Sequence, residues 1–321
     1  MNLHLVKDIL AKDIVSEPIR KGFGRGLLEA GKKDENVVAA CADLTDSTQI
    51  SLFAEAFPER FVEIGVAEQN LATVGSGLAA MGKIPFVSSY AAFSPGRNWE
   101  QIRTTICLNN RYVKIVGSHA GLYTGPDGAT HQMLEDIALM RVLPNMVVIA
   151  PGDSIEAEKA TMALAKDKRP GYLRLARDSS PVVTTKDTPF DIGKAYTFCE
   201  GKDLTIISTG TMTYHGMVAA EKLYKDGIDV EVIHCPTIKP LDSATIIKSV
   251  NKTNRVITIE EHQTTGGLGA AVAELLSEEH PVKIRRLGVD DQFGESGKPE
   301  ELLEKHKLTW KHIMLEVHRM F

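Results

Sequence analysis

The chain has 321 residues, of which 43% are hydrophobic and 25% are charged, and its formal net charge is −5. This is the composition of a soluble globular protein, and the length allows two domains of ordinary size. The sequence has no dense block of Lys or Arg and no apolar run of about 20 residues, which excludes a nucleic-acid-binding protein and a membrane-spanning one.

The cysteines and the N-terminal residues indicate the cellular compartment of the protein. The four cysteines have neither CxxC spacing nor nearby histidine clusters, and they are Cys41, Cys107, Cys199 and Cys235. We expect buried free thiols rather than disulfides or a zinc site. The opening residues resemble no signal peptide, so we expect a cytoplasmic protein.

Short apolar runs alternate with amphipathic stretches along the chain, which is typical of a parallel sheet covered by helices. After an N-terminal segment of residues 1–14, a first domain is expected over 15–180. Its expected strands are 37–42, 61–64, 84–89, 113–117, 146–150 and 171–175. Its expected helices are 19–31, 68–81, 99–108, 131–142 and 155–166, and Asp153 or Ser154 would cap the last of them.

A segment rich in helix breakers follows, and we expect residues 181–202 to be a linker. A second α/β domain is then expected over 203–321. Its expected strands are 204–208, 229–234, 255–260 and 282–287, with helices at 212–225, 242–249, 268–277 and 310–318. The GGLG run at 266–269 lacks the full GxGxxG pattern of a dinucleotide loop, so we expect a tight turn that opens a helix.

Residues 65–70 (GVAEQN) place a single carboxylate, Glu68, at the start of an apolar helix. Such a carboxylate can simply interact with the positive end of the helix. Alternatively, an acid with apolar neighbours such as Val66 and Leu71 can exchange a proton with the nitrogen of a bound ring. The residues alone leave both interpretations open.

Two aromatic residues, Tyr90 and Phe93, follow the expected strand 84–89. Ligands bind at the carboxyl ends of parallel strands, and an aromatic face can hold a flat heterocycle by offset stacking. Two ordinary core aromatics are the alternative. The segment after them, SPGR at 94–97, contains helix breakers, and the role of Arg97 is open.

The loop GPDGATHQ at 125–132 contains an acid, Asp127, and a histidine, His131. A sugar needs acceptors for its hydroxyls and a donor to the oxygen that gains charge during reaction, and these two side chains suit those tasks. Thr130 is expected to cap a helix whose first turn includes His131. Arg177 follows the strand 171–175, where its guanidinium fork suits a phosphate or makes a surface salt bridge; Arg174 is a weaker second choice.

Together these segments resemble the C-terminal half of the transketolases, from about residue 15 to the end. The resemblance implies a pyrimidine-binding domain followed by a transketolase C-terminal domain, and thiamine diphosphate as the cofactor. It implies that Glu68 bonds to N1′ of the aminopyrimidine, that Phe93 stacks on this ring and that Tyr90 lines the pocket.

The resemblance assigns further residues to the cofactor and the sugar. It implies that Asp43 and Leu44 approach the thiazolium side of the cofactor. It also implies that Asp127 contacts the C2 hydroxyl of the sugar, His131 the C1 hydroxyl and the carbonyl oxygen, and Arg177 the phosphate. The expected reaction is transfer of a two-carbon ketol unit from a ketose phosphate to an aldose phosphate.

No Gly-Asp-Gly segment of the kind that holds the diphosphate through Mg²⁺ (or Ca²⁺) is present; the nearest fragments are 152–154 (GDS) and 225–227 (KDG). We therefore expect a split enzyme whose N-terminal partner subunit supplies the metal site. The resemblance implies an α₂β₂ heterotetramer in which two copies of this chain meet through the helix 68–81. The alternatives are a 1-deoxyxylulose-5-phosphate synthase-like enzyme, the β subunit of a 2-oxo acid dehydrogenase and a non-catalytic subunit.

Overall fold

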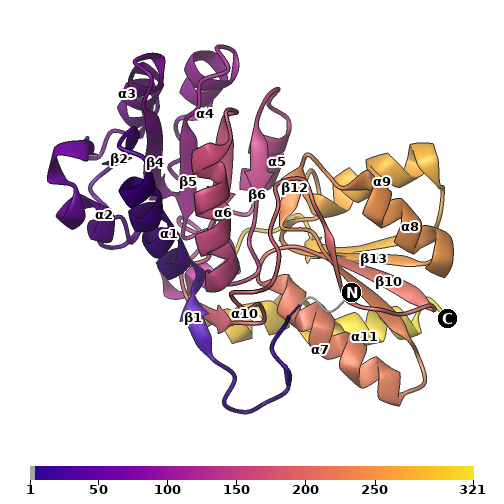
Figure 1. Ribbon diagram of the computed structural model, residues 1–321. Coiled ribbons are helices and arrows are strands. Elements are labelled where there is room, and N and C mark those ends of the chain that lie inside the picture. Colours follow the sequence, from indigo (N-terminus) through magenta and orange to yellow (C-terminus); the bar gives the residue numbers. More distant parts are fainter. Residues whose placement is uncertain (1–3) are drawn as a thin grey trace.

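The computed structural model describes residues 4–321 and contains two large sheets that lie side by side (Figure 1). Of the expected N-terminal segment, residues 1–3 lie outside the described part, and residues 4–14 contain neither helix nor strand. Both sheets are mostly parallel and covered by helices, so the predicted fold class is confirmed.

The first sheet has seven strands in the order β12-β6-β7-β5-β4-β2-β3. Six of them were predicted and run parallel: β2 (Val37–Cys41), β3 (Phe61–Glu63), β4 (Ile84–Tyr90), β5 (Lys114–Ser118), β6 (Val147–Ile149) and β7 (Gly171–Arg174). The seventh, β12 (Thr237–Lys239), comes from the C-terminal part of the chain and pairs antiparallel with β6.

Helices cover both faces of this sheet. They are α1 (Ile19–Lys33), α2 (Ser51–Ala56), η1 (Pro58–Arg60), α3 (Glu68–Ala80), α4 (Trp99–Gln101), the π-helix η2 (Ile102–Cys107), η3 (Leu122–Asp127), α5 (Asp136–Arg141) and α6 (Ser154–Lys166). One core joins α1 and α6 to the sheet, and a second core joins α3, η2 and α5 to its other face. Close packing of α1 on α6 requires Gly22, where a Cβ atom would lie 1.8 Å from the backbone oxygen of Ser154.

The predicted helix 131–142 is wrong in its first part, because α5 begins only at Asp136. The backbone just before α5 has other partners: Met133 forms a parallel bridge with Ala120, and its oxygen accepts from the N–H of Gly121 at 2.9 Å. The oxygen of Leu134 accepts from the N–H of Gln263 at 2.8 Å. Thr130 therefore caps no helix; its Oγ1 atom lies 2.9 Å from Nδ1 of His131.

The second sheet has the order β14-β13-β10-β11-β9. Its strands are β9 (Tyr196–Cys199), β10 (Leu204–Ser208), β11 (Val230–His234), β13 (Val256–Gln263) and β14 (Ile284–Val289). Its helices are α7 (Met212–Lys225), α8 (Ser243–Thr253), α9 (Leu268–Glu279), α10 (Pro299–Lys305) and α11 (Trp310–His318). The antiparallel edge strand β9 lies inside the segment expected to be a linker, and β1 (Ser16–Pro18) pairs with β8 (Ser179–Pro181).

The GGLG run forms the expected turn before a helix. The carboxylate of Glu260, in β13, accepts hydrogen bonds from the backbone N–H groups of Leu268 at 2.6 Å and Gly269 at 2.7 Å, the first two residues of α9. Glu260 therefore satisfies donors that a helix N-terminus leaves unpaired. The predicted cap of α6 is also confirmed, because Asp153 accepts from the backbone N–H of Glu156.

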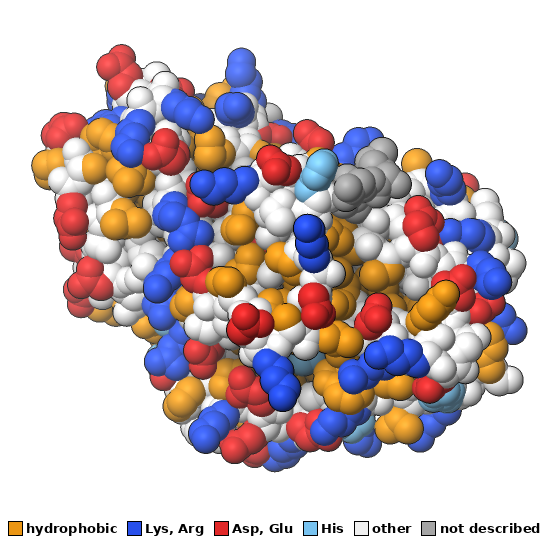
Figure 2. Space-filling view, turned by 60° about the horizontal axis from the view of Figure 1, so that its bottom comes forward, with side chains coloured by type: hydrophobic (Ala, Val, Ile, Leu, Met, Phe, Trp, Pro, Cys, Tyr) orange, Lys and Arg blue, Asp and Glu red, His pale blue; other side chains and the backbone are white. Residues whose placement is uncertain are grey.

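The surface carries charges of both signs, and the cysteines are free thiols, as expected from the sequence. On the face shown in Figure 2, Lys and Arg side chains alternate with Asp and Glu around a central group of hydrophobic ones. No helix within residues 4–321 is long and apolar enough to cross a membrane. All four cysteines are free thiols as predicted; three are buried and Cys199 is partly exposed.

Candidate active site

The candidate residues gather at the carboxyl ends of the parallel strands in the first sheet. Glu68 follows β3, Tyr90 ends β4, and Arg177 follows β7. All strand ends of this kind point to one edge of the sheet, where open α/β sheets bind ligands. Three segments far apart in the sequence therefore meet at one place.

Glu68 is the first residue of α3, and it is buried with a relative exposure of 2%. Its Oε2 atom accepts a hydrogen bond from Nη1 of Arg97 at 2.6 Å. The amide of Asn98 donates to the backbone oxygen of Glu68 at 2.8 Å. In the described part of the chain, no side-chain or backbone group donates to the other carboxylate oxygen, Oε1.

The aromatic side chains lie beside this carboxylate. The rings of Tyr90 and Phe93 are nearly parallel, with centroids 6.1 Å apart, and His131 meets Phe93 edge-on at 5.4 Å. His119 stacks on Tyr90 at 3.8 Å, and Arg97 lies over the Phe93 ring at 4.8 Å. The structure thus brings together Tyr90, Phe93 and His131, as the sequence analysis predicts.

His119 is a member of the cluster that sequence reasoning missed. It directly follows β5, its relative exposure is 2%, and its Nδ1 atom lies 2.9 Å from Oγ of Ser118. Burial, together with the positive charges of Arg20 and Arg177, lowers the pKa of His119 to about 3. His119 is therefore neutral at physiological pH and can donate one hydrogen bond and accept one. Its place directly after a buried strand was the available signal.

The predicted phosphate residue Arg177 has a second arginine beside it. Its Nε atom lies 3.9 Å from the carboxylate of Asp127, and its Nη1 atom donates to the backbone oxygen of Thr124 at 3.1 Å. Arg20 donates from Nε to the backbone oxygen of Arg177 at 3.1 Å and from Nη1 to that of Ser47. Burial and the charge of Arg177 lower the pKa of Arg20. The Arg20 side chain thus lies against the backbone of Arg177, and two arginines in one region suit a bound anion.

Arg174, the weaker choice for the phosphate, is excluded by its surroundings. It is 5% exposed, and its Nε atom lies 3.0 Å from Oδ2 of Asp136. Its Nη2 atom donates to the backbone oxygen of Glu261 at 2.7 Å, and Asp136 also accepts from the hydroxyl of Tyr172 at 2.6 Å. Arg174 therefore joins the two domains and does not face a ligand.

Asp43 and Leu44 lie at the same edge but apart from the ring cluster. Asp43 is exposed, has a φ of 56°, and donates from its backbone N–H to Oε1 of Glu63 at 2.7 Å. Leu44 is partly buried and packs on the core. Within residues 4–321 no hydrogen bond or ion pair joins either side chain to Glu68 or Phe93, so their predicted role at the cofactor stays a prediction.

The fragment at 152–154 serves a structural purpose. The carboxylate of Asp153 accepts from the backbone N–H groups of Glu156, Val183 and Thr184, at distances of 2.9, 2.9 and 2.7 Å. All of these bonds lie inside the protein, so this acid is used as a helix cap. Over residues 4–321 there is no group of three His, Cys, Asp or Glu side chains that could hold a metal ion.

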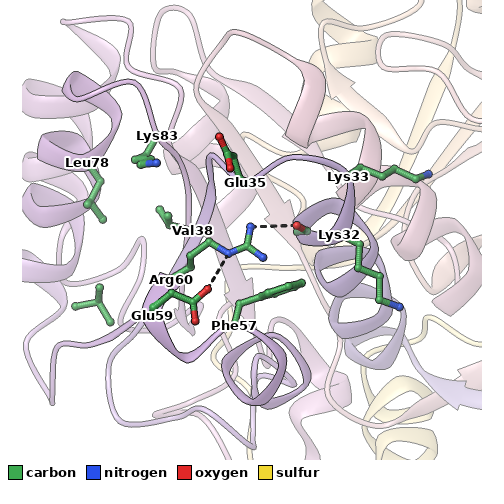
Figure 3. Close-up of a pocket in the computed structure, with 11 residues that line it drawn as sticks. Lys32, Lys33, Glu35, Val38, Phe57, Glu59, Arg60, Leu78 and Lys83 are labelled. Carbon is green, nitrogen blue, oxygen red and sulfur yellow. Dashed lines mark hydrogen bonds and ion pairs between the residues drawn. The ribbon is translucent and has the colours of Figure 1, made fainter.

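A cavity of about 950 Å³ lies elsewhere (Figure 3). Its lining includes Glu35 and Lys83, which precede β2 and β4, so it lies at the amino ends of the strands, opposite the candidate site. Arg60 in its wall donates to the backbone oxygen of Gly31 at 3.0 Å and stacks on Phe57 at 3.6 Å. These contacts stabilise the C-terminal end of α1 and do not indicate a ligand for the cavity.

Comparison with known proteins agrees with this geometry. Residues 17–182 match the transketolase pyrimidine-binding domain, and residues 193–313 match the transketolase C-terminal domain. A provisionally named transketolase C-terminal section of Methanocaldococcus jannaschii is 45% identical over 302 residues, covering 93% of this chain and 95% of that protein. A 6-deoxy-6-sulfo-D-fructose transketolase subunit of Clostridium sp. (strain MSTE9) is 40% identical over 294 residues, covering 92% and 91%.

Among solved structures, a split-gene transketolase described as an inactive β₄ tetramer superimposes with a TM-score of 0.88. It is 44% identical to this chain, and the match covers 94% of this chain and 97% of that one. The chain belongs to the transketolase family, and it carries the pyrimidine-binding and C-terminal domains in the arrangement of a split transketolase subunit.

Proposed function

We propose that this chain supplies the pyrimidine-binding and sugar-binding half of a two-subunit transketolase that uses thiamine diphosphate. The observation that carries this proposal is the juxtaposition of Glu68, which is buried, with the rings of Phe93, Tyr90 and His131. Such a site recognises a flat, nitrogen-containing ring by stacking and by one hydrogen bond to a carboxylate.

The described residues fit the aminopyrimidine end of the cofactor. Glu68 has one carboxylate oxygen, Oε1, without a donor in the described chain, and Phe93 is only partly buried. Glu68 would hold a proton between this oxygen and N1′ of the ring, which favours the imino form of the cofactor. When bound, the cofactor supplies the nucleophilic carbon that takes up the two-carbon unit.

The second group of residues would handle the sugar. Asp127 would accept from a hydroxyl, while His131 and the neutral His119 would donate to oxygens of the substrate. Arg177 would bind the phosphate with Arg20 beside it, because the Arg20 side chain packs on the backbone of Arg177 and a guanidinium group suits a phosphate. We expect a ketose phosphate as donor and an aldose phosphate as acceptor.

The diphosphate and its Mg²⁺ would be held by an N-terminal partner subunit. The reason is that the acid nearest to a Gly-Asp-Gly segment, Asp153, already caps a helix. In an α₂β₂ complex, two copies of this chain would meet along α3. One face of α3 packs on this chain's own sheet through Leu71 and Gly75, while Thr73 and Gly77 are exposed and available to a second copy.

Reconstitution tests the proposal. This chain alone should bind thiamine diphosphate weakly and catalyse no ketol transfer, whereas adding an N-terminal transketolase subunit from the same organism should give Mg²⁺-dependent transfer. Calorimetry that finds tight, Mg²⁺-dependent binding to this chain alone would contradict the two-subunit proposal. A stable monomer that forms only a 1:1 complex with the partner would contradict the α₂β₂ assembly.

A further inference from the structure

Arg97 contacts the buried carboxylate of the site directly. Its Nη1 atom lies 2.6 Å from Oε2 of Glu68, and its guanidinium carbon lies 4.8 Å from the centroid of the Phe93 ring. The Arg97 side chain is 49% exposed, whereas that of Glu68 is 2% exposed. A cation that reaches inward to one buried carboxylate and rests on an aromatic ring is held from two sides.

The backbone that carries Arg97 is shaped to reach Glu68. The N–H of Gly96 donates to the oxygen of Ala91 at 3.2 Å, and that of Arg97 to the oxygen of Phe93 at 3.0 Å. A Cβ atom on Gly96 would lie 2.1 Å from the oxygen of Ala92, so this tight turn requires glycine.

The next residue, Asn98, binds the backbone of Glu68, whereas Arg97 binds its side chain. The side-chain amide of Asn98 donates to the backbone oxygen of Glu68 at 2.8 Å and to Oγ of Ser94 at 3.1 Å. Arg97 and Asn98 thus hold, respectively, the carboxylate and the backbone of one residue. The turn at 94–96 therefore places two successive residues in contact with Glu68.

We propose that Arg97 is a positioning residue that binds Oε2 of Glu68, so that Oε1 is the oxygen presented to the ring nitrogen of the bound cofactor. A carboxylate has two oxygens, and the bond to Arg97 engages only one of them. This inference rests on the proposed role of Glu68.

The test uses the complex of this chain with its partner subunit, thiamine diphosphate and Mg²⁺. The first measurement is the rate of hydrogen–deuterium exchange at C2 of the bound cofactor, followed by NMR without any sugar present. The second is the dissociation constant of the cofactor. Arg97→Gln should slow the exchange about a hundredfold and change the dissociation constant less than about threefold. Arg97→Lys should recover at least about a tenth of the wild-type rate, because it keeps the charge.

Arg103→Gln is the matched control, because it removes the same charge from an exposed position on the following π-helix and should leave both measurements unchanged. Thermal unfolding of each variant checks that the fold is kept. Exchange at the wild-type rate in Arg97→Gln would overturn the inference, and so would cofactor binding at least about tenfold tighter, because Arg97 would then compete with the cofactor. Glu68→Gln separates the two proposals: if it too exchanges at the wild-type rate, the proposed role of Glu68 fails.

Discussion

Among the arginine–carboxylate pairs of the first domain, Arg174–Asp136 and Arg97–Glu68 differ in what surrounds them. Arg174 and Asp136 are both buried, at 5% and 0% side-chain exposure. Tyr172 donates a further hydrogen bond to Asp136, and the backbone oxygen of Glu261 accepts one from Arg174. In the pair of Arg97 with Glu68, the arginine is half exposed and one carboxylate oxygen has no donor in the described chain.

The difference separates a structural pair from one that suits a ligand. A pair that is buried on both sides is out of reach of a substrate, and removing one partner leaves an uncompensated charge in a low-dielectric interior. A pair with one free oxygen at the edge of a sheet keeps capacity for another hydrogen bond. The number of unused acceptors distinguishes the two pairs more clearly than their distances of 3.0 and 2.6 Å.

The largest effect is expected for Glu68→Gln in the reconstituted complex. Glutamine keeps the shape and can hydrogen-bond, but it cannot exchange a proton with the ring nitrogen. We expect kcat to fall about 10⁴-fold, equivalent to ~5 kcal/mol of barrier, while assembly stays intact. Steady-state kinetics and sedimentation measure both. Activity within about tenfold of the wild type would mean that Glu68 is not the activating group.

The same substitution in the two arginines sharpens the comparison. Arg174→Gln should reduce the free energy of unfolding by about 3–5 kcal/mol, because it leaves Asp136 buried without its counter-charge. Arg97→Gln should reduce it by only about 1–2 kcal/mol, although Glu68 is buried, because residue 97 is half exposed and the glutamine amide can still donate to the carboxylate. Denaturant titration of the two variants gives the result. Equal losses in both would remove the distinction between the pairs.

Arg177→Ala should act on substrate binding and depend on the substrate. For phosphorylated sugars we expect KM to rise about 30-fold, equivalent to ~2 kcal/mol for a charge-assisted contact. For hydroxypyruvate, a two-carbon donor without a phosphate, KM should change little. A similar rise for both donors would assign Arg177 to structure.

The smallest effect concerns His119 and pH. Its pKa in the folded chain is about 3, below the ordinary value of 6.5, so between these values the unfolded chain binds more protons. The free energy of unfolding should therefore fall as the pH falls below 6.5, by about 1 kcal/mol from this group at pH 5.5. His119→Gln should remove that part of the slope. His215, whose pKa is also lowered by burial, to about 4, stays in both proteins as an internal reference. An unchanged slope would contradict the assignment to His119.

The sequence predicted the sheet and the ring cluster well because their signals are local. A buried strand shows as an apolar run, and Tyr90, Phe93 and His131 stand directly after such runs or in a glycine-bounded loop. The start of α5 was predicted wrongly because Met133 and Leu134 bond through their backbones to Gly121 and Gln263, and local periodicity does not show such contacts.

Long-range contacts explain the residues that sequence reasoning missed or misjudged. Arg20 lies on the first turn of α1 and resembles any surface arginine until the fold places it against Arg177. Arg174 resembles a ligand-binding residue until Asp136 and Glu261 enclose it. The role of a charged side chain is set by its partners, and those partners are distant in the sequence.

Because strand β12 belongs to the sheet of the first domain, we expect neither domain to be stable when expressed alone. A chain cut near residue 182 would lack Thr237–Lys239 and leave β6 as an open sheet edge, which invites pairing with other molecules. Gene recombination near residue 182 would therefore separate the seven-stranded sheet from its edge strand β12. Residues 17–182 and 193–313 match two different domain families, but the first sheet takes a strand from the second domain. We therefore expect evolution to keep the two domains together in one chain.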